Sequence, residues 1–449
     1  MLTGLHTALV RRALLPLRER RRGHATFHRL RSLLASQWWP PERIRDVQLL
    51  RLRALVARAA EAPYYRDRLR EASVRPEDLR QMDDLAALPL LEKAVLRERP
   101  DALSPGGLAG GTRRRRTSGS TGVPVEVWVP AETRQAIRAR LWRLGTWWDT
   151  WPWDRKLVLL ARRDRARVDR WRDALLQNLV EHAATDLSEV RLAALARDLR
   201  RGVRVLEGYP SSLAVLAHYL LDRGLPPPPA LRAVFVTGET LHPDQRRLMA
   251  RAFGAPVVNT YGCSEVGLIA GACKAGRLHL AAEDLIVEFL PVPGAGGLAE
   301  VVVTDLTNHV MPLLRYRLGD LGLAGTPCPC GRTLPVVDLR AGRVAELVLL
   351  PDGRRADFTV VSRPIDELVA EGLRLHQYRV VQHAPDLLEV QVVAPGEERR
   401  VADLLPGRLR RALGPGLVVK VQVLDAIPPD PSGKLRRFIS CLAPGPSDG

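Results

Sequence analysis

The feature that most constrains the fold is an alternation of short apolar runs with helical patterns, between about residues 155 and 305. The apolar runs resemble buried strands and occupy residues 157–160, 203–206, 233–236 and 301–303. Helical patterns lie between some of them, at residues 186–200 and 211–223. Strands and helices that alternate in this way are typical of a parallel sheet covered by helices. The expected fold class is therefore α/β.

The pattern changes after about residue 340. Short strand-like segments at 346–350, 377–382, 388–393 and 418–424 mix with helical patterns near 363–371 and 400–413. This mixture predicts a small α+β domain. We therefore expect a large multi-sheet α/β domain over residues 1–340, with a helical lead-in at about 1–100, and a small mobile domain over residues 341–449.

The formal net charge of +18 suggests nucleic acid as a partner. Arginine supplies nearly all of the positive charge, because the only lysines are Lys93, Lys156, Lys274, Lys420 and Lys434. The arginines are spread along the whole chain, and no aromatic-basic module or recognition-helix signature accompanies them. No specific nucleic-acid partner is therefore expected, although such a surface binds anions at low salt.

Composition also bears on location. No run of eighteen apolar residues occurs, so a membrane-spanning helix is not expected. Five cysteines in 449 residues do not make a disulfide framework, so a cytoplasmic location is expected. The first 30 residues contain many arginines and a single acid, Glu19, and lack the apolar core of a secretory signal. This segment fits a helix packed on the domain, or a basic amphipathic helix in peripheral contact with a membrane.

The first chemical motif is a loop of hydroxyl and glycine residues. It contains Thr117, Ser118, Gly119, Ser120, Thr121 and Gly122. Backbone N–H groups and hydroxyls in such a loop can donate to a polyphosphate. The loop is not a Walker A motif, because no Gly-Lys-Ser/Thr follows. By itself the pattern also fits an ordinary polar surface loop.

A second motif follows an apolar run and reads Tyr261-Gly262-Cys263-Ser264-Glu265. Tyr261 can stack on a purine, and the Ser264 hydroxyl can donate to a phosphate. Glu265 offers the hard carboxylate oxygen that Mg²⁺ prefers. The alternative is a turn at the end of a strand with a solvated acid.

Three further short motifs follow in order. Asp320, after Tyr-Arg-Leu-Gly, can accept hydrogen bonds from both hydroxyls of a ribose, and Arg343 follows Gly342 near the expected domain boundary. Lys434 lies on a glycine turn near the C-terminus, where a compact ammonium suits a developing phosphoryl charge. Each motif alone fits an ordinary turn, but all five in this order indicate nucleotide chemistry.

Together these motifs resemble those of the adenylate-forming superfamily of acyl-CoA synthetases, luciferases and peptide-synthetase adenylation domains. Within it the chain is most similar to the phenylacetate–CoA ligase-like branch. The similarity covers about residues 45–440. Further segments that carry it are 62–66 (Ala-Pro-Tyr-Tyr-Arg), 88–93 (Leu-Pro…Lys), 208–212 (Gly-Tyr-Pro-Ser-Ser), 237–239 (Thr-Gly-Glu) and 328–332 (Cys-Pro-Cys-Gly-Arg).

The resemblance implies that ATP activates a carboxylic acid to its acyl-AMP with release of pyrophosphate, and that coenzyme A then accepts the acyl group. It also implies that a small C-terminal domain swings across a nucleotide site in the large domain. Lys434 would contact the carboxylate and the α-phosphate during adenylation. By the same resemblance, Thr117 to Gly122 would cradle the β,γ-phosphates, and Gly238 and Glu239 would lie beside the adenine with Tyr261 stacked on it. Gly262 would belong to the same cofactor-binding segment. Ser264 would meet the α-phosphate, Glu265 would bind Mg²⁺, and Asp320 and Arg343 would hold the ribose.

Three places depart from the family's pattern. Val125 and Glu126 follow the phosphate loop where a basic or hydroxyl residue is usual, and Ser264 replaces the commoner Thr but keeps the hydroxyl. Ala345 stands two residues after Arg343, where the hinge usually carries an acid or a lysine. The first half-reaction is therefore better supported than the domain rotation that the second one needs.

Four residues form a candidate zinc site: Cys273, His279, Cys328 and Cys330. Three thiolates and one imidazole make a closed tetrahedral set, which predicts a structural metal rather than a catalytic one. The alternative is a group of buried, inert cysteines with a surface histidine.

Two other classes of function remain open. One is an adenylating enzyme whose acceptor is an amine, a hydroxyl or a carrier-protein thiol, and the other is a non-catalytic basic binding protein that keeps the fold. The sequence gives no signal for an oligomeric state. A cluster of tryptophans fits either a core or interface patch or the lining of an aromatic acyl pocket; it comprises Trp142, Trp147, Trp148, Trp151 and Trp153.

Overall fold

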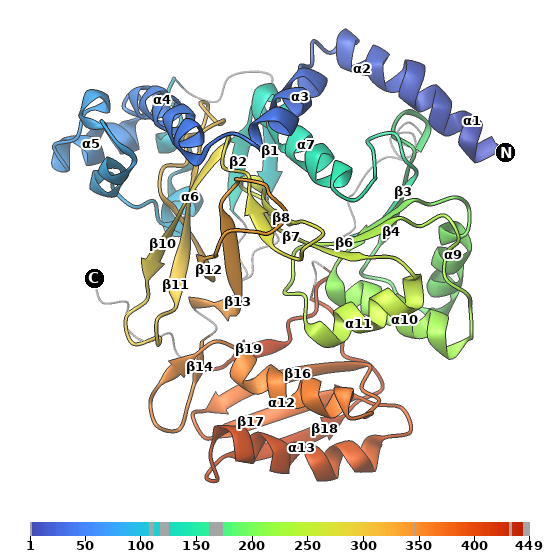
Figure 1. The fold of residues 1–449 in the computed structure, drawn as a ribbon. Coiled ribbons are helices and arrows are strands. Elements are labelled where there is room, and N and C mark those ends of the chain that lie inside the picture. Colours follow the sequence, from blue (N-terminus) through green and yellow to red (C-terminus); the bar gives the residue numbers. More distant parts are fainter. Residues whose placement is uncertain are drawn as a thin grey trace.

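The computed structural model describes residues 2–106, 112–116, 125–160, 174–344, 347–430 and 433–442. The chain forms a large lobe, which runs through strand β13 (Val336–Arg343), and a small lobe, which begins at strand β14 (Val348–Leu349). The small lobe lies below the large one in Figure 1. Strand β13 spans the expected boundary at residue 340, and the α/β fold class is confirmed.

The lead-in of the large lobe is helical, and its first part, residues 2–59, lies across the top of the molecule (Figure 1). Its main helices are α1 (Leu2–Leu9), α2 (Leu15–Arg21), α3 (Thr26–Ser36), α4 (Pro41–Ala59), α5 (Pro63–Glu71) and α6 (Lys93–Glu98), with a π-helical turn η1 (Val10–Leu14) and the 3-10 turns η2 (Pro76–Asp78), η3 (Met82–Ala87) and η4 (Pro100–Leu103). Pro63 begins α5, as suits a residue that has no N–H to donate in the first helical turn.

The basic N-terminal helices contact the large lobe. Glu19 of α2 accepts a hydrogen bond of 2.8 Å from Arg138, and the amide of Asn178 donates to the hydroxyl of Thr7 at 3.0 Å. Val10 and Leu15 are buried. Among the helices of the described ranges, none is both long and apolar enough to cross a membrane.

Within the described residues, eleven strands form one mixed sheet, in the order β10-β11-β12-β13-β9-β8-β7-β6-β5-β3-β4. One half is parallel, as the alternation predicts. It contains β3 (Lys156–Leu160), β4 (Leu179–Ala183), β5 (Val205–Gly208), β6 (Ala233–Val236) and the start of β7 (Val257–Cys263). Helices α9 (Glu189–Leu199), α10 (Pro210–Asp222) and α11 (Pro243–Phe253) pack on one face of this half.

The other half of the sheet is antiparallel. Its strands are β8 (Gly267–Ala272), β9 (Leu278–Leu280), β10 (Leu285–Pro291), β11 (Ala299–Asp305), β12 (Tyr316–Ala324) and β13. A hairpin turn after β7 switches the sheet from one pattern to the other. A separate two-stranded sheet pairs β1 (Arg113–Arg116) with β2 (Glu126–Val129).

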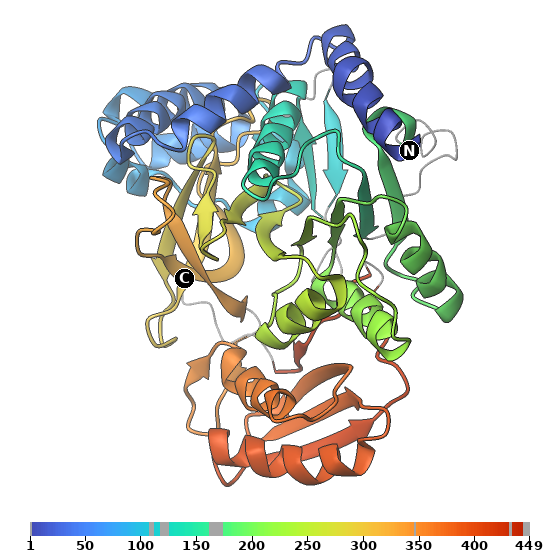
Figure 2. The same ribbon diagram turned by 45° about the vertical axis from the view of Figure 1, so that its right-hand side comes forward.

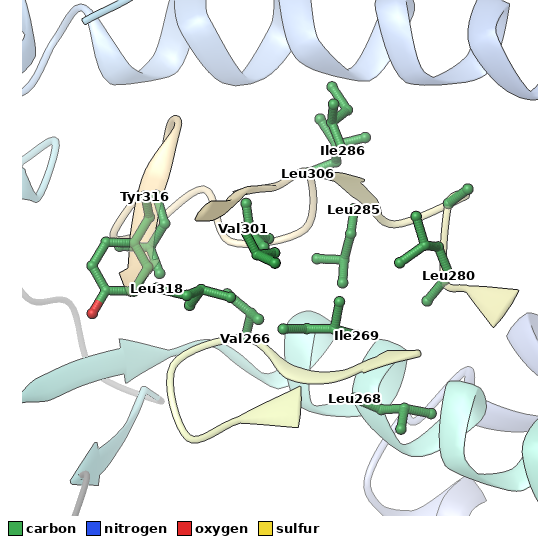
Figure 3. Close-up of a cluster of buried hydrophobic side chains, with 14 of the residues drawn as sticks. Val266, Leu268, Ile269, Leu280, Leu285, Ile286, Val301, Leu306, Tyr316 and Leu318 are labelled. Atoms are coloured by element: carbon green, nitrogen blue, oxygen red, sulfur yellow. The ribbon is translucent and has the colours of Figure 1, made fainter. Parts of the chain in front are cut away.

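Helix α7 (Ala131–Thr146) packs against α3 and against β8, which begins the antiparallel half; Figure 2 gives a second view of this arrangement. The largest core joins α7, the lead-in helices and the antiparallel strands. Figure 3 shows its centre, where Ile269, Leu285 and Val301 interdigitate from three different strands. Tyr316 lies at the edge of this cluster, so its ring is held by apolar packing.

The small lobe has its own core. Within the residues described there, four strands form a sheet in the order β18-β17-β16-β19, from β16 (Gln377–Ala384), β17 (Leu387–Val393), β18 (Val418–Val423) and β19 (Phe438–Ser440). Helices α12 (Thr359–Ala370) and α13 (Glu398–Leu413) pack on it, and β14 pairs with β15 (Arg355–Ala356). Figure 1 shows this layer beneath the large lobe.

Candidate functional site

The turn between β7 and β8 positions the second sequence motif. The turn is tight: a Cβ on Gly262 would collide with the carbonyl oxygen of Gly267, and Gly267 itself has φ +79°. Glycine meets both demands because it has no Cβ and tolerates positive φ. Ser264 and Glu265 therefore lie at the point where the sheet changes direction.

Glu265 is 3% exposed, and its carboxylate has two polar neighbours. The hydroxyl of Tyr316 donates to its carboxylate at 2.9 Å, and the ammonium of Lys93 lies 3.9 Å away. Burial and the nearby Glu265 carboxylate raise the pKa of Tyr316 above its usual range, so this phenol stays a donor.

Lys93 reaches Glu265 because the lead-in joins the sheet through its backbone. Leu91 forms a parallel bridge with Tyr316: its N–H donates to the carbonyl of Arg315 at 3.0 Å, and its carbonyl accepts from the N–H of Arg317 at 3.1 Å. Lys93 stands in none of the five sequence motifs, so its place in the site was not predicted. The signal that could have found it is its rarity, since it is one of five lysines in the chain.

Asp320, Arg343 and Tyr261 form a second polar group. The guanidinium of Arg343 lies 3.0 Å from one carboxylate oxygen of Asp320, and the Tyr261 hydroxyl donates to the other at 3.0 Å. Asp320 and Arg343 face each other because they pair across β12 and β13. Burial, followed by the Asp320 charge, raises the pKa of Tyr261 well above its usual range. The third and fourth sequence motifs are thus brought together.

Lys434 comes from the small lobe and enters the large one. Its Cε lies 3.3 Å from the position that a Cβ on Gly238 would take, and its ammonium lies 5.4 Å from the ring centre of Tyr209. Burial lowers the pKa of Lys434, and the neighbouring Glu239 carboxylate opposes that shift. The turn that carries it needs Gly433, whose φ is +79°.

Glu239 joins the two lobes. Its carboxylate accepts hydrogen bonds from the N–H and the hydroxyl of Ser211, at 2.9 and 2.8 Å, and from the N–H of Leu435 in the small lobe at 2.8 Å. Burial raises the pKa of the Glu239 carboxyl, and these hydrogen bonds oppose the rise. Ser211 and Leu435 are partners that the sequence analysis did not foresee.

An ion pair also holds the lobes together. Arg437 of the small lobe lies 3.0 Å from the Asp244 carboxylate of α11, and it donates to the Tyr378 hydroxyl at 2.9 Å. Burial, followed by the charge of Asp244, raises the pKa of the nearby Asp366 to about 7. The small lobe is therefore docked by specific polar contacts.

These groups line a cavity of about 350 Å³ between the lobes. The candidate residues at its wall are Gly238, Glu239, Tyr261, Gly262, Ser264, Glu265, Asp320, Arg343 and Lys434. Such a volume is typical of small-molecule sites. The predicted phosphate loop, Thr117 to Gly122, and the hinge position Ala345 lie outside the described residues.

A second cavity of about 450 Å³ adjoins the first, sharing Gly238, Ser264 and Lys434 with it. It runs between α7 and the parallel strands. Trp142 and Trp151 line it, whereas Trp147 is buried in the main core and its indole N–H donates to Gln37. The tryptophans are therefore divided between a pocket wall and the core.

The four predicted zinc ligands gather at one place. One candidate ligand atom from each of Cys273, His279, Cys328 and Cys330 lies within 4.8 Å of all the others. The closest approaches are 3.5 Å between the sulfurs of Cys273 and Cys328, and 3.3 Å between the Cys330 sulfur and His279 Nε2. His279 Nδ1 lies 3.1 Å from the carbonyl oxygen of Leu334, which can accept a hydrogen bond from Nδ1–H and so leave Nε2 free for a metal.

No protein-family model matches the sequence. A phenylacetate–coenzyme A ligase of Thermus thermophilus is 28% identical over 344 residues, which are 69% of this chain and 73% of the relative. A phenylacetate–coenzyme A ligase of Pseudomonas putida is 24% identical over 86% of this chain and 91% of its own length.

Solved structures share the fold. One is a 2-hydroxyisobutyryl-CoA ligase in the postadenylation state in complex with R3-HIB-AMP, which is 21% identical over 90% of each chain, with a TM-score of 0.73. The same ligase with 2-HIB-AMP and CoA in the thioesterification state covers 90% of this chain and 91% of its own, at 22% identity and a TM-score of 0.59. In sequence the chain is thus similar to phenylacetate–coenzyme A ligases, and it shares its fold with a CoA ligase whose structures contain an acyl-AMP.

Proposed function

We propose that this enzyme uses ATP to activate a carboxylic acid as its acyl-AMP and then transfers the acyl group to coenzyme A. The observation that carries the proposal is the position of Lys434. The small lobe delivers this ammonium into the same cavity as Ser264, Glu265 and the Asp320–Arg343 pair. The relatives in sequence bear the name of ligases that couple phenylacetate to coenzyme A.

The nucleotide would lie along the β7–β8 turn. Asp320 faces the cavity and is oriented by Arg343 and Tyr261, which leaves carboxylate lone pairs to accept from ribose hydroxyls. Ser264 at the turn would donate to the α-phosphate. Glu239 points toward Ser211 and Leu435, so we assign it to holding the lysine loop as well as to bordering the adenine.

Glu265 is the residue that would hold Mg²⁺. Its carboxylate offers a hard oxygen next to the turn where phosphates would bind, and Mg²⁺ is commonly held by one or two carboxylates together with substrate phosphates. When bound, the ion would neutralise charge on the phosphates. Tyr316 fixes the orientation of the carboxylate by its hydrogen bond of 2.9 Å.

In the first step, a carboxylate oxygen of the acid attacks the α-phosphorus of ATP. The bond from that phosphorus to the bridging oxygen of pyrophosphate breaks, and pyrophosphate leaves with the electron pair. Lys434 would stabilise the negative charge that builds between the acid and the α-phosphate. Positioning and charge stabilisation account for most of the catalysis in transfers of this kind.

In the second step, the thiolate of coenzyme A attacks the acyl carbonyl carbon. The bond from that carbon to the phosphate oxygen breaks, AMP leaves, and the thiol proton passes to solvent. The resemblance implies that the small lobe turns for this step, since Lys434 and Leu435 line the cavity in the docked arrangement.

Pyrophosphate release with a panel of carboxylic acids tests the first step, and product mass with coenzyme A tests the second. We expect acid-dependent exchange between ATP and pyrophosphate, followed by a thioester. Absence of exchange with every acid of the panel would refute the proposal. An acyl-AMP that never becomes a thioester would refute its second half.

We also propose that Cys273, His279, Cys328 and Cys330 hold one structural Zn²⁺. Their ligand atoms already lie within 4.8 Å of one another, and four protein ligands leave no open position for water. The cluster would tie the β8–β9 hairpin to the 328–332 segment, which are far apart in the chain.

A further inference from the structure

The second cavity bears on which acid the enzyme uses, so this inference rests on the proposed function. The cavity meets the nucleotide cavity at Ser264 and Lys434, where the carboxylate of the acid would be activated. The remainder of the acid can then extend into the space between α7 and the parallel strands. The residues that line this space therefore indicate the chemistry of the part of the acid that lies away from its carboxylate.

Part of the wall is apolar. Ile137, Leu144, Phe235 and Leu268 line it, together with the ring of Trp142. Phe235 and Leu268 are each less than a tenth exposed, so their positions are fixed by packing. An apolar segment of the acid would gain contact area here without leaving a polar group unpaired.

The wall also carries an ion pair. The ammonium of Lys156 on β3 lies 3.2 Å from the carboxylate of Glu207 on β5, and both residues line the cavity. The side chains alternate along β3: Leu157 and Leu159 are buried under the helices on the other face, whereas Lys156 stays 39% exposed. The alternation of strand side chains therefore directs the pair toward the cavity.

The other charged residues of this wall, apart from the shared Lys434, already have partners, and they include Arg18 and Arg115. Asp154 lies 3.2 Å from Arg204 and accepts from the N–H of Trp151 at 2.8 Å. Arg138 donates to Glu19 of the N-terminal helix. Glu207, by contrast, is 25% exposed beside the partly exposed ammonium of Lys156, so the pair keeps hydrogen-bonding capacity for a ligand.

We propose that the acid carries a hydroxyl group, or another neutral group that both donates and accepts, at the end away from its carboxylate. Such a group can donate to Glu207 and accept from Lys156 at once. A distal carboxylate would face the Glu207 charge, and a distal ammonium would face that of Lys156. An acid with a wholly apolar tail would remove water from the ion pair and return no hydrogen bond.

The test compares two matched pairs of acids by exchange between ATP and pyrophosphate: phenylacetic acid with its para-hydroxy derivative, and hexanoic acid with 6-hydroxyhexanoic acid. We expect the hydroxy acid to have a kcat/KM roughly ten- to a hundredfold higher in at least one pair, the range for a hydrogen bond to a charged group. Lys156→Met and Glu207→Gln should each reduce this preference. Lys420→Met, on the exposed strand β18, is the matched control and should keep it.

Equal or better activity of the unsubstituted acids in both pairs would overturn this inference and leave the proposed function standing. A preference that Lys156→Met and Glu207→Gln both leave unchanged would also overturn it, and would show that the pair only links β3 to β5. Exchange with none of the acids in this set or in the wider panel would overturn the proposed function, and this inference with it.

Discussion

The backbone N–H of Leu435 in the small lobe donates a hydrogen bond of 2.8 Å to the carboxylate of Glu239 in the large lobe. Leu435 directly follows Lys434, so this contact fixes the depth at which the ammonium enters the cavity. Ser211, at the start of α10, donates to both oxygens of the same carboxylate. Glu239 therefore couples the docking of the small lobe to the position of Lys434.

Replacing Glu239 with alanine should slow adenylation about tenfold to a hundredfold, because a hydrogen bond to a charged group is lost at the docking point. Glu239→Gln keeps one acceptor oxygen and should lose less. Exchange between ATP and pyrophosphate measures the effect. Thioester formation from supplied acyl-AMP should change little, and an equal loss in both assays would show that Glu239 serves the fold rather than the docking.

Lys434→Ala should reduce acyl-AMP formation by about 10²–10³, the usual effect of losing one contact to transition-state charge. Conversion of supplied acyl-AMP to the thioester should stay largely intact. Lys420→Ala, at an exposed position of the same lobe, is the control. Pyrophosphate release that matches the wild type would remove Lys434 from the proposed mechanism.

Purified protein should contain about one zinc per chain. The double variant Cys328→Ser/Cys330→Ser should lose the metal and unfold at a lower temperature, because two of four ligands are gone. Cys441→Ser removes an exposed thiol and should leave both metal content and melting temperature unchanged. Elemental analysis decides the matter: absence of zinc from the wild type, or full retention in the double variant, would refute the site.

His218 should make the protein less stable in mild acid. It lies on α10 with its ring 4.0 Å from that of His376 in the small lobe, and burial, with the repulsion of His376, lowers its pKa to about 3. A histidine with a lowered pKa binds its proton mainly in the unfolded state, so its stabilising effect is present above pH 6.5 and is lost as the pH falls toward 3.

The expected slope from this group is up to about 1.4 kcal/mol per pH unit. Urea unfolding at pH 7.5, 6.5 and 5.5 should therefore show a smaller loss of stability in His218→Gln than in the wild type. His28→Gln, in the lead-in, provides a histidine control. Parallel pH profiles for wild type and His218→Gln would show that this residue does not contribute.

The periodic parts of the chain could be predicted from sequence. The parallel strands β3, β5 and β6 and the helices α9 and α10 lie within a few residues of the expected segments. The antiparallel half of the sheet could not be foreseen, because its pairing is fixed by the β7–β8 turn and by contacts between distant strands. Short apolar runs such as 301–303 look alike in either kind of sheet.

The candidate site was likewise only partly predictable from the sequence. Asp320 and Arg343 stand in short motifs, so sequence could nominate both of them. Their ion pair, however, depends on the register of β12 and β13. Glu239 was expected beside the adenine, and its bond to Leu435 depends on how the lobes dock. Whether each nominated residue performs its assigned role stays a prediction until the variants are measured.

The bridge between Leu91 and Tyr316 makes the helical lead-in part of the proposed active site. It occupies the edge of β12 near Arg317, where β12 no longer pairs with β13, and it sets Lys93 beside Glu265. A shortened protein that begins at the first parallel strand would keep the nucleotide-binding turn but lose this ammonium and leave that edge bare. The smallest functional unit of this chain therefore starts well before the sheet that gives the fold its class.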